Sequence, residues 1–380
     1  MRSSKINVLC LVSSLCVGGA EKHTITLANL LNPRVFNVHL GYLKPVEALL
    51  SQVREELAGC TFCLHVSKRI DFPAVSRLRT FIDSNKIDVI VATHEYPALY
   101  SLMARRGARC TPRLIEVFHA TGYLGFKSKL QMQLYRPVFK RCDLLVYVSE
   151  TQREYWRSRG FSGKRDIVIH NGVNLERFRD RSDSSEREAL RAQCGFSAND
   201  LLIGICAALR PEKAHRDLLL ALSRLRGRGM SAKVLIVGDG PERSTIEQTI
   251  AALDLSRCVF ITGFKDDVRP YLAICDVMVL ASHAIETFSI AALEAMAMGK
   301  PLVLTRIGGA EEQVIAGQNG FLYEPGDIDA LTDKLAALQS ESTRRRMGMA
   351  SRERVESLFS EDRMMEQFER QIQALGRRAN

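Results

Sequence analysis

The feature that most constrains the fold of this chain is its repeated alternation of short apolar runs with amphipathic segments. Runs such as Ile6–Val12 and Leu201–Ala207 have the length and composition of strands that are buried on both faces. Helical patterns, for example Ala20–Leu31, separate most of these runs. This order predicts parallel sheets that are covered by helices on both faces. The other strand candidates are Val35–Leu43, Ile87–Ala92, Arg113–Val117, Leu144–Val148, Ile167–Ile169, Lys233–Val237, Val259–Ile261, Val277–Leu280 and Pro301–Thr305.

The alternation is interrupted once, by a polar and charged stretch from Asn171 to Asp200. A chain of 380 residues is long enough for two domains of ordinary size. We therefore predict two α/β domains, residues 1–175 and 176–359, with a linker near 171–200. Apolar side chains at helical spacing predict a last helix over Ser360–Leu375.

The positive charge of the chain is concentrated in its first half. Residues Met1 to Phe178 hold 26 Lys and Arg against 14 Asp and Glu, a formal charge of +12, whereas the whole chain carries +10. Such a surface suggests an anionic partner: a membrane, a phosphate-bearing acceptor or nucleic acid. No recognisable nucleic-acid motif accompanies the charge, so we expect no nucleic acid to bind.

One basic segment is either an ordinary solvated helix or an amphipathic surface that rests on anionic lipid. Its basic residues surround apolar ones, and the set is Phe126, Lys127, Lys129, Leu130, Leu134, Arg136, Val138, Phe139, Lys140 and Arg141. The apolar stretch Ile6 to Val17 is too short to span a bilayer and lacks a cleavage site. We expect a cytoplasmic enzyme, with peripheral association to the cytosolic membrane face as an open alternative.

Metal binding and disulfides are not predicted. Cys10 and Cys206 lie inside apolar runs, where a thiol behaves as a small hydrophobe. The lone pair Cys60 and Cys63 has no second pair or neighbouring His, so it is weak evidence for zinc. Asp327 and the acidic residue two positions later open a likely helical pattern and are interpreted as N-terminal capping.

The segment from Glu286 to Gly299 is the most informative. A helix is predicted to begin near Phe288 or Ser289, and its N-terminus would suit a diphosphate. Glu294 lies in this otherwise apolar helix, where a carboxylate needs a hydrogen-bonding partner. Ribose hydroxyls are one such partner; a neighbouring backbone group or an Arg is the alternative.

This segment resembles the E-x7-E motif of glycosyltransferase family 4, and further segments resemble the family's signatures in the same order along the chain. They are Val17-Gly-Gly-Ala-Glu21, Ile169-His-Asn-Gly-Val173, Leu209-Arg-Pro-Glu-Lys-Ala-His215, Val237-Gly-Asp-Gly-Pro-Glu242, Gly263-Phe264, Ile307-Gly-Gly-Ala-Glu311 and Asn319-Gly-Phe-Leu322.

The resemblance implies a GT-B-like fold: two Rossmann-like domains facing a cleft, with the acceptor mainly on the first and the donor mainly on the second. It implies that the C-terminal helix, within 360–380, crosses back to the first domain. It also implies transfer of a hexose-type sugar, with retained configuration and without a cofactor or metal, from a UDP- or GDP-linked donor to a glycan or lipid-linked acceptor. The alternatives are an epimerase on the same fold and a non-catalytic nucleotide-sugar-binding relative.

The resemblance also implies roles for individual residues. Glu286 would contact the transferred sugar and Glu294 the ribose, while Lys213 would neutralise the departing diphosphate. His119 resembles a family histidine near the sugar and acceptor, although a structural histidine is the alternative. Gly18 and Gly19 would admit the donor phosphates, or they only form a turn. The expected donor-binding set is Gly18, Gly19, Arg210, Lys213, Gly263, Phe264, Thr287, Phe288, Ser289 and Glu294.

The chain departs from the family pattern in two ways. Ala208 stands where the family usually has an arginine, and Arg210 is the candidate substitute. Thr287 and Ser289 replace two glycines, and their hydroxyls either bond the donor or narrow the pocket. A nicotinamide site at Gly238–Pro241 is not expected, because Arg243 stands where the dinucleotide fingerprint needs its third glycine.

Overall fold

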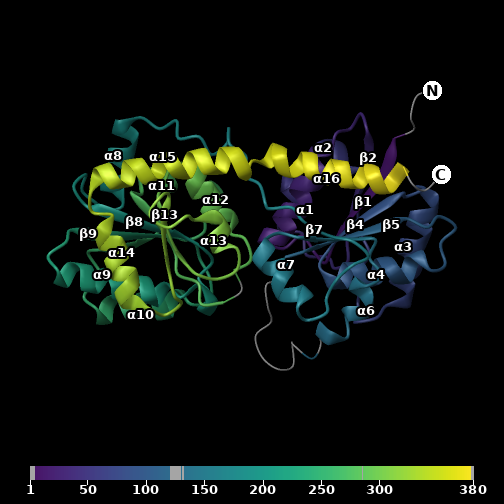
Figure 1. The fold of residues 1–380 in the computed structure, drawn as a ribbon, viewed down its shortest axis with the longest axis horizontal. Helices are drawn as coiled ribbons and strands as arrows, with labels where there is room; N and C mark the ends of the chain where they lie inside the picture. The colour runs from purple at the N-terminus through teal and green to yellow at the C-terminus, as the bar shows by residue number, and fades with distance from the viewer. Residues whose placement is uncertain (1–4, 120–129, 131, 285, 378–380) are drawn as a thin grey trace. The chain divides into compact units, whose positions relative to one another are not determined.

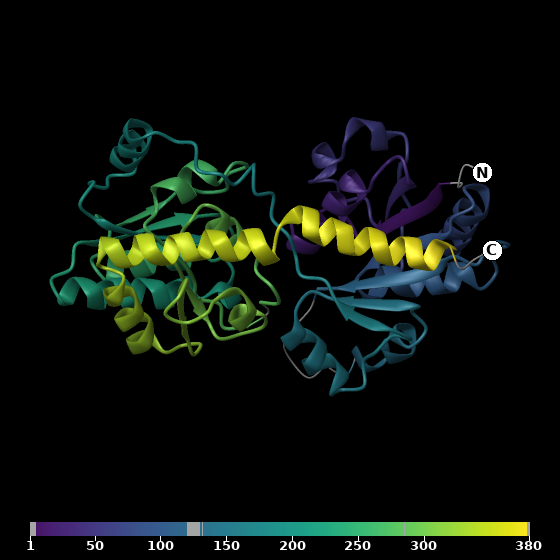
Figure 2. The same ribbon diagram turned by 45° about the horizontal axis from the view of Figure 1, so that its top comes forward.

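The chain folds into two compact units, each built around one parallel sheet. The computed structural model describes residues 5–119, 130, 132–284 and 286–377. Unit 1 comprises residues 1–171 and 362–380, and unit 2 comprises residues 172–361. Figures 1 and 2 show helices on both sides of each sheet. The prediction of a two-sheet α/β fold is therefore confirmed.

The sheet of unit 1 has seven strands in the order β3-β2-β1-β4-β5-β6-β7, and every neighbouring pair is parallel. Six strands lie within one or two residues of the predicted runs; the seventh, β3, was not predicted. The strands are β1 (Ile6–Val12), β2 (Phe36–Tyr42), β3 (Thr61–Cys63), β4 (Val89–Thr93), β5 (Arg113–Phe118), β6 (Leu144–Tyr147) and β7 (Asp166–Val168).

Two helices of unit 1, α3 and α7, begin at a residue whose side chain caps them. Asp71 accepts a hydrogen bond from the Ala74 amide at 3.0 Å, and Ser149 accepts one from Gln152 at 3.1 Å. The helices are α1 (Gly19–Leu30), α2 (Glu55–Ala58), α3 (Phe72–Ser84), α4 (Glu95–Arg105), α6 (Arg136–Phe139), α7 (Glu150–Arg157) and α16 (Glu361–Gly376), with the 3-10 turn η1 (Leu50–Gln52).

The C-terminal helix α16 packs on unit 1, as expected (Figure 1). Its buried face comprises Met364, Met365, Phe368, Ile372 and Leu375. Phe368 is fully buried, and its ring lies 5.4 Å from that of His23 on α1. Because this apolar stripe repeats at helical spacing, the helix completes the core of the N-terminal part of the chain.

The sheet of unit 2 has six parallel strands in the order β10-β9-β8-β11-β12-β13. Its strands are β8 (Leu201–Cys206), β9 (Ala232–Val237), β10 (Val259–Ile261), β11 (Val277–Leu280), β12 (Leu302–Thr305) and β13 (Gly320–Tyr323). Its helices are α8 (Ser184–Gln193), α9 (His215–Gly227), α10 (Arg243–Ala252), α11 (Arg269–Ile274), α12 (Ile290–Ala297), α13 (Ala310–Gln313), α14 (Ile328–Ala337) and α15 (Glu341–Leu358), with the 3-10 turn η2 (Pro211–Lys213).

Three local predictions need correction. The stretch near 171–200 is not only a linker, because Asp183 and Glu186 form a capping box that starts α8. The helix after Glu286 begins later than predicted, at Ile290, because Ser289 is its cap. Strand β13 was not predicted. The interpretation of Asp327 is confirmed, since its side chain accepts from the Ala330 amide at 2.9 Å and caps α14.

In both sheets the strand order reverses beside the first strand, between β1 and β4 and between β8 and β11. Ligands of open parallel sheets bind at the carboxyl ends of the strands flanking such a point. We therefore expect ligands at the carboxyl ends of β1 and β4 in unit 1, and of β8 and β11 in unit 2.

The basic segment of unit 1 is only partly described. Phe126, Lys127 and Lys129 lie outside the described residues. Leu130 and Leu134 are 58% and 71% exposed, whereas Val138 and Phe139 of α6 are buried and therefore do not face lipid. Among the described helices, none combines the length and the apolarity that crossing a membrane requires.

We expect Phe368→Ala to lower the free energy of unfolding of unit 1 by about 3–5 kcal/mol, because it removes a fully buried aromatic ring. The only tryptophan, Trp156, is buried in unit 1, so its fluorescence during urea denaturation reports this unit. Arg370→Ala is the matched control on the exposed face of α16, and we expect a change within about 0.5 kcal/mol. Equal effects of both variants would contradict this role of α16.

Candidate active site

The loops that follow β8 and β11 bring two predicted residues of unit 2 together. Lys213 lies in η2 after β8, and Glu286 lies on the loop between β11 and α12. The Lys213 Nζ is 2.5 Å from the Glu286 Oε2, and the Ser282 hydroxyl donates to the same oxygen at 3.1 Å. Lys213 and Glu286 are 21% and 19% exposed, so the pair is half-buried but open to a ligand.

The loop that carries Lys213 is held by contacts with the loop after β11. The His283 amide donates to the Glu212 carbonyl at 2.9 Å, and the His283 Nε2 lies 2.5 Å from the Asp217 Oδ2. Ala214 joins η2 to α9 in a left-handed conformation with φ of 48°. This conformation costs an alanine about 1 kcal/mol, so the surrounding contacts must hold it.

The loop after β12 fixes the backbone around Glu286. The Gly309 amide donates to the Thr287 carbonyl at 2.7 Å, and Gln313 Nε2 donates to the Ser289 carbonyl at 2.8 Å. Gly308 has φ of 54°, and a Cβ at this position would lie 1.9 Å from the Glu286 carbonyl oxygen. Glycine is therefore needed at position 308 so that this loop can approach the backbone of Glu286.

The start of α12 uses the hydroxyl of Ser289 for structure. Its Oγ accepts from the Ala292 amide at 3.3 Å, and both Thr287 and Ser289 are buried. The Phe288 ring is also buried and packs 5.2 Å from Phe359. Glu294 is half-buried one turn into the helix.

The remaining predicted donor residues of unit 2 lie on the loops after β10 and β8. Gly263 follows β10 with φ of 73°, and its carbonyl accepts from the Gly238 amide at 3.1 Å. The next residue, Phe264, is 59% exposed. Arg210 is exposed just before η2, and its side chain forms no hydrogen bond or ion pair within the part of the chain that the structure describes. Ala208 is exposed as well.

In unit 1, Gly18 caps the N-terminus of α1 and Gly19 is its first residue. Gly18 has an extended backbone, so its role is not a left-handed turn. A Cβ at Gly18 would lie 2.2 Å from the Glu21 carboxylate oxygen. The glycine therefore admits the Glu21 side chain to the start of the helix.

His119, at the end of β5, lies in a cluster of three histidines that the sequence did not predict. Its ring centroid is 4.7 Å from that of His23 and 5.8 Å from that of His94. His94 directly follows β4 with an unusual φ of 73°, and His23 lies on α1. All three belong to segments that follow neighbouring strands. Their positions after predicted strands are the one feature of the sequence from which the cluster could have been predicted.

Burial controls the charge of this cluster. It lowers the pKa of His23 to about 4 and that of His119 well below its ordinary value, where the neighbouring histidines add to the effect. Both imidazoles are therefore neutral at pH 7, and His119 can accept or donate a hydrogen bond without carrying charge. Among the described residues, no group of three or more His, Cys, Asp or Glu side chains is placed to hold a metal ion.

We expect the stability of unit 1 to fall as the pH drops from 6.5 toward 4. The unfolded chain binds a proton at His23 near pH 6.5, whereas the folded chain does so only near pH 4, so protons favour unfolding in this window. Between about pH 7 and about pH 4.5, the wild type should lose about 2.5 kcal/mol more than His23→Phe does. Trp156 fluorescence during urea denaturation at each pH gives the free energy of unfolding of both proteins.

His65→Asn is the control for this measurement, because His65 is exposed and asparagine tolerates its left-handed backbone. The free energy of unfolding of this variant should change with pH as that of the wild type does. An unchanged slope in His23→Phe would show that His23 does not cause the acid sensitivity.

Two family models together match most of the chain. The model described as Glycosyltransferase Family 4 matches residues 17–177, and the model described as Glycosyl transferases group 1 matches residues 186–354.

The chain is also similar to individual proteins along most of its length. The chain is 27% identical over 303 residues to N-acetyl-alpha-D-glucosaminyl L-malate synthase of Bacillus anthracis, covering 79% of this chain and 78% of that protein. It is 28% identical over 351 residues to a protein of Bacillus subtilis named as a glycosyltransferase, EpsD, covering 87% and 91%. The crystal structure of HepE of Anabaena in complex with UDP-glucose matches with a TM-score of 0.83 and 23% identity, covering 97% of this chain and 100% of that chain.

One family accounts for the fold, for the contact between Lys213 and Glu286, and for the matches to both family models. The chain belongs to glycosyltransferase family 4 and is a glycosyltransferase with the GT-B fold.

Proposed function

We propose that this enzyme is a retaining glycosyltransferase that transfers a hexose-type sugar from a UDP- or GDP-linked donor to a glycan or lipid-linked acceptor, in the synthesis of a cell-surface polysaccharide or glycolipid. The observation that carries the proposal is the half-buried pair of Lys213 and Glu286 at the carboxyl ends of β8 and β11. An ammonium group beside a carboxylate suits a ligand with an anionic part next to a hydroxylated part.

The diphosphate of the donor would take the place of Glu286 beside Lys213. Lys213 then neutralises charge that grows on the diphosphate as the glycosidic bond breaks, which stabilises the transition state. The released carboxylate of Glu286 accepts a hydrogen bond from a hydroxyl of the sugar. The pair therefore keeps both groups positioned before the donor arrives.

The reaction we propose is a front-face displacement. The acceptor oxygen forms a bond to the anomeric carbon on the side from which the diphosphate leaves, and the acceptor proton passes to a departing phosphate oxygen. No separate protein nucleophile is needed, because the acceptor oxygen attacks the anomeric carbon directly, and Glu286 contacts a sugar hydroxyl instead. His119 would contribute as a neutral hydrogen-bonding group near the sugar and acceptor.

The names of two of these proteins support the substrate classes. The HepE structure contains UDP-glucose, which supports a UDP-linked hexose as the donor. The Bacillus anthracis relative is named for L-malate, which is an anion, so an anionic acceptor is compatible with this family.

Glu286→Ala and Glu294→Ala should fail differently. Glu286→Ala should bind UDP or GDP as tightly as the wild type, or more tightly, because Lys213 loses its competing carboxylate. Its sugar transfer should fall. Glu294→Ala should weaken both the nucleoside diphosphate and the intact donor by about 1–3 kcal/mol, through loss of a charged hydrogen bond to ribose. Calorimetry measures binding, and Glu353→Ala is an exposed control in the same unit.

Several outcomes would contradict these assignments. The reverse pattern would mean that the roles of Glu286 and Glu294 are exchanged. A wild type that binds neither UDP nor GDP would refute the proposed function. Analysis of the sugar after incubation with donor separates transfer from epimerisation, because an epimerase releases an altered sugar without an acceptor.

We expect Arg210 to assist Lys213 in holding the diphosphate. Arg210 is exposed and its carbonyl accepts from the Lys213 amide at 3.0 Å, so the two side chains share one short turn. Arg210→Ala should lower turnover at least ten-fold, about 1.4 kcal/mol of lost transition-state stabilisation. Ala208→Arg should give little change. A silent Arg210→Ala together with a faster Ala208→Arg would show that Arg210 does not replace the usual family arginine.

A further inference from the structure

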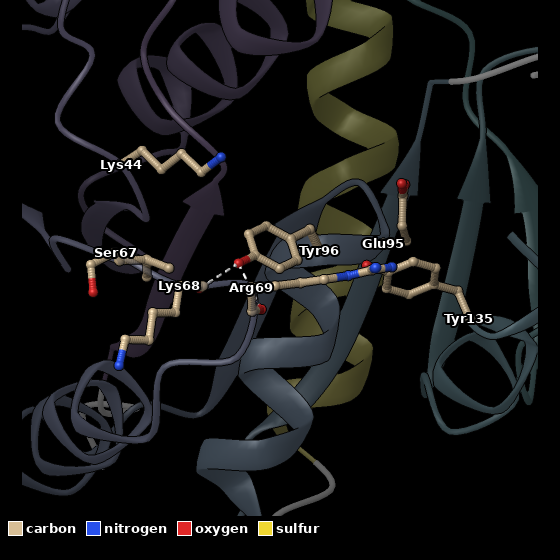
Figure 3. A pocket seen from close by; sticks show the side chains of 8 residues that line it. Lys44, Ser67, Lys68, Arg69, Glu95, Tyr96 and Tyr135 are labelled. Atoms are coloured by element: carbon tan, nitrogen blue, oxygen red, sulfur yellow. Dashed lines mark hydrogen bonds between the residues drawn. The ribbon is translucent and has the colours of Figure 1, made fainter. Parts of the chain in front are cut away.

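Unit 1 contains a cavity of about 350 Å³ that none of the predicted site residues lines. It lies at the carboxyl edge of the sheet, where Lys44 follows β2, Arg69 follows β3, and Glu95 and Tyr96 begin α4 after β4. The complete lining is Lys44, Val66, Ser67, Lys68, Arg69, Glu95, Tyr96 and Tyr135 (Figure 3).

The charge of the lining is positive. Lys44, Lys68 and Arg69 outnumber the single carboxylate, Glu95. Within the ranges that the structure describes, none of the three cations forms an ion pair, although many other arginines of the chain do. An excess of three cations over one carboxylate around one cavity favours an anionic ligand.

Hydrogen bonds to the backbone carbonyls of Lys68 and Arg69, and from Ser67, hold their loop in place. Tyr96 Oη donates to the Arg69 carbonyl at 2.9 Å and also reaches the Lys68 carbonyl at 3.3 Å. The Ser67 amide and hydroxyl both donate to Asp71 Oδ2 at 3.1 Å, and Asp71 in turn caps α3. Because folding already fixes this loop, a ligand does not need to order it.

The side of the cavity near Arg69 also holds a carboxylate, Glu95, and a phenol, Tyr135. Figure 3 shows the Arg69 guanidinium beside Tyr135 and Glu95. Burial, and then the Glu95 charge, raise the pKa of Tyr135, so its phenol stays protonated. A carboxylate accepts hydrogen bonds from hydroxyl groups but repels an anion. The wall near Glu95 therefore suits the hydroxyls of a sugar, and the cations suit a phosphate.

We propose that this cavity binds a sugar phosphate as part of the acceptor, with its phosphate on Lys44 and Arg69 and a sugar hydroxyl on Glu95. The inference rests on the proposed function, because it assigns the acceptor side of that reaction. A phosphate monoester carries close to two negative charges at pH 7, which matches the excess of cations in the lining. Arginine presents a planar fork to phosphate oxygens, and lysine adds a mobile point charge.

Calorimetry with glucose 1-phosphate tests the site. Arg69→Gln and Lys44→Gln should each weaken binding at least ten-fold, and Arg69→Lys should weaken it less. Lys213→Gln should leave this binding unchanged, because Lys213 belongs to unit 2. Arg106→Gln removes an exposed charge of unit 1 that does not line the cavity, so it controls for net charge and should have no effect.

A second arm separates a soluble acceptor from a lipid-linked one. The probe is phosphatidylcholine vesicles that carry a polyprenyl phosphate. Vesicle binding that Arg69→Gln abolishes would support the site and assign a lipid-linked source, whereas binding of glucose 1-phosphate alone would support the site and assign a soluble one.

The inference is overturned if Arg69→Gln and the wild type bind both probes equally, or if Lys213→Gln alone loses binding. It is also overturned if the wild type binds neither probe while it still binds UDP or GDP, which leaves the proposed function intact. Failure to bind any nucleoside diphosphate would instead refute the proposed function itself.

Discussion

Parallel pairing constrains every functional part of this molecule, because all strands of a parallel sheet end at the same edge. The loops after β8, β11 and β12 must therefore meet, although the residues they carry are far apart in the sequence. This is how Lys213 reaches Glu286 and how the loop containing Gly308 reaches the backbone of Glu286. The same constraint gathers His23, His94 and His119 in unit 1. Burial of both sheet faces holds this arrangement, since strands covered on both sides cannot slip without exposing apolar surface.

The fold was largely predictable because its strands are buried on both faces and therefore appear as continuous apolar runs. The exceptions have physical reasons. Strand β3 has only three residues, Thr61–Cys63, and β13 only four, so neither gives a strong pattern. Helix α8 has no buried residue, so its polar sequence resembled a linker. A short edge strand and a solvated helix are both specified by their neighbours more than by their own composition.

The sequence nominated residues for the candidate site but did not indicate how they contact one another. Lys213 and Glu286 were assigned to different parts of the donor, and their direct contact depends on which strands are neighbours. The sequence does not show that order. His23 and His94 were missed for the same reason, since each becomes noticeable only when it is placed beside His119. The cavity in unit 1 likewise combines residues that follow four different strands, and no single segment among them forms a motif.

The half-buried contact between Lys213 and Glu286 also bears on how this chain can vary. Replacing either residue alone leaves a partly desolvated charge without its ion-pair partner, which costs more than replacing both with neutral groups of similar shape. A lineage that keeps the fold but abandons the chemistry would therefore tend to change the two positions together. Covariation between positions 213 and 286 is thus a mark by which descendants that have lost transfer can be told from those that have only changed their sugar.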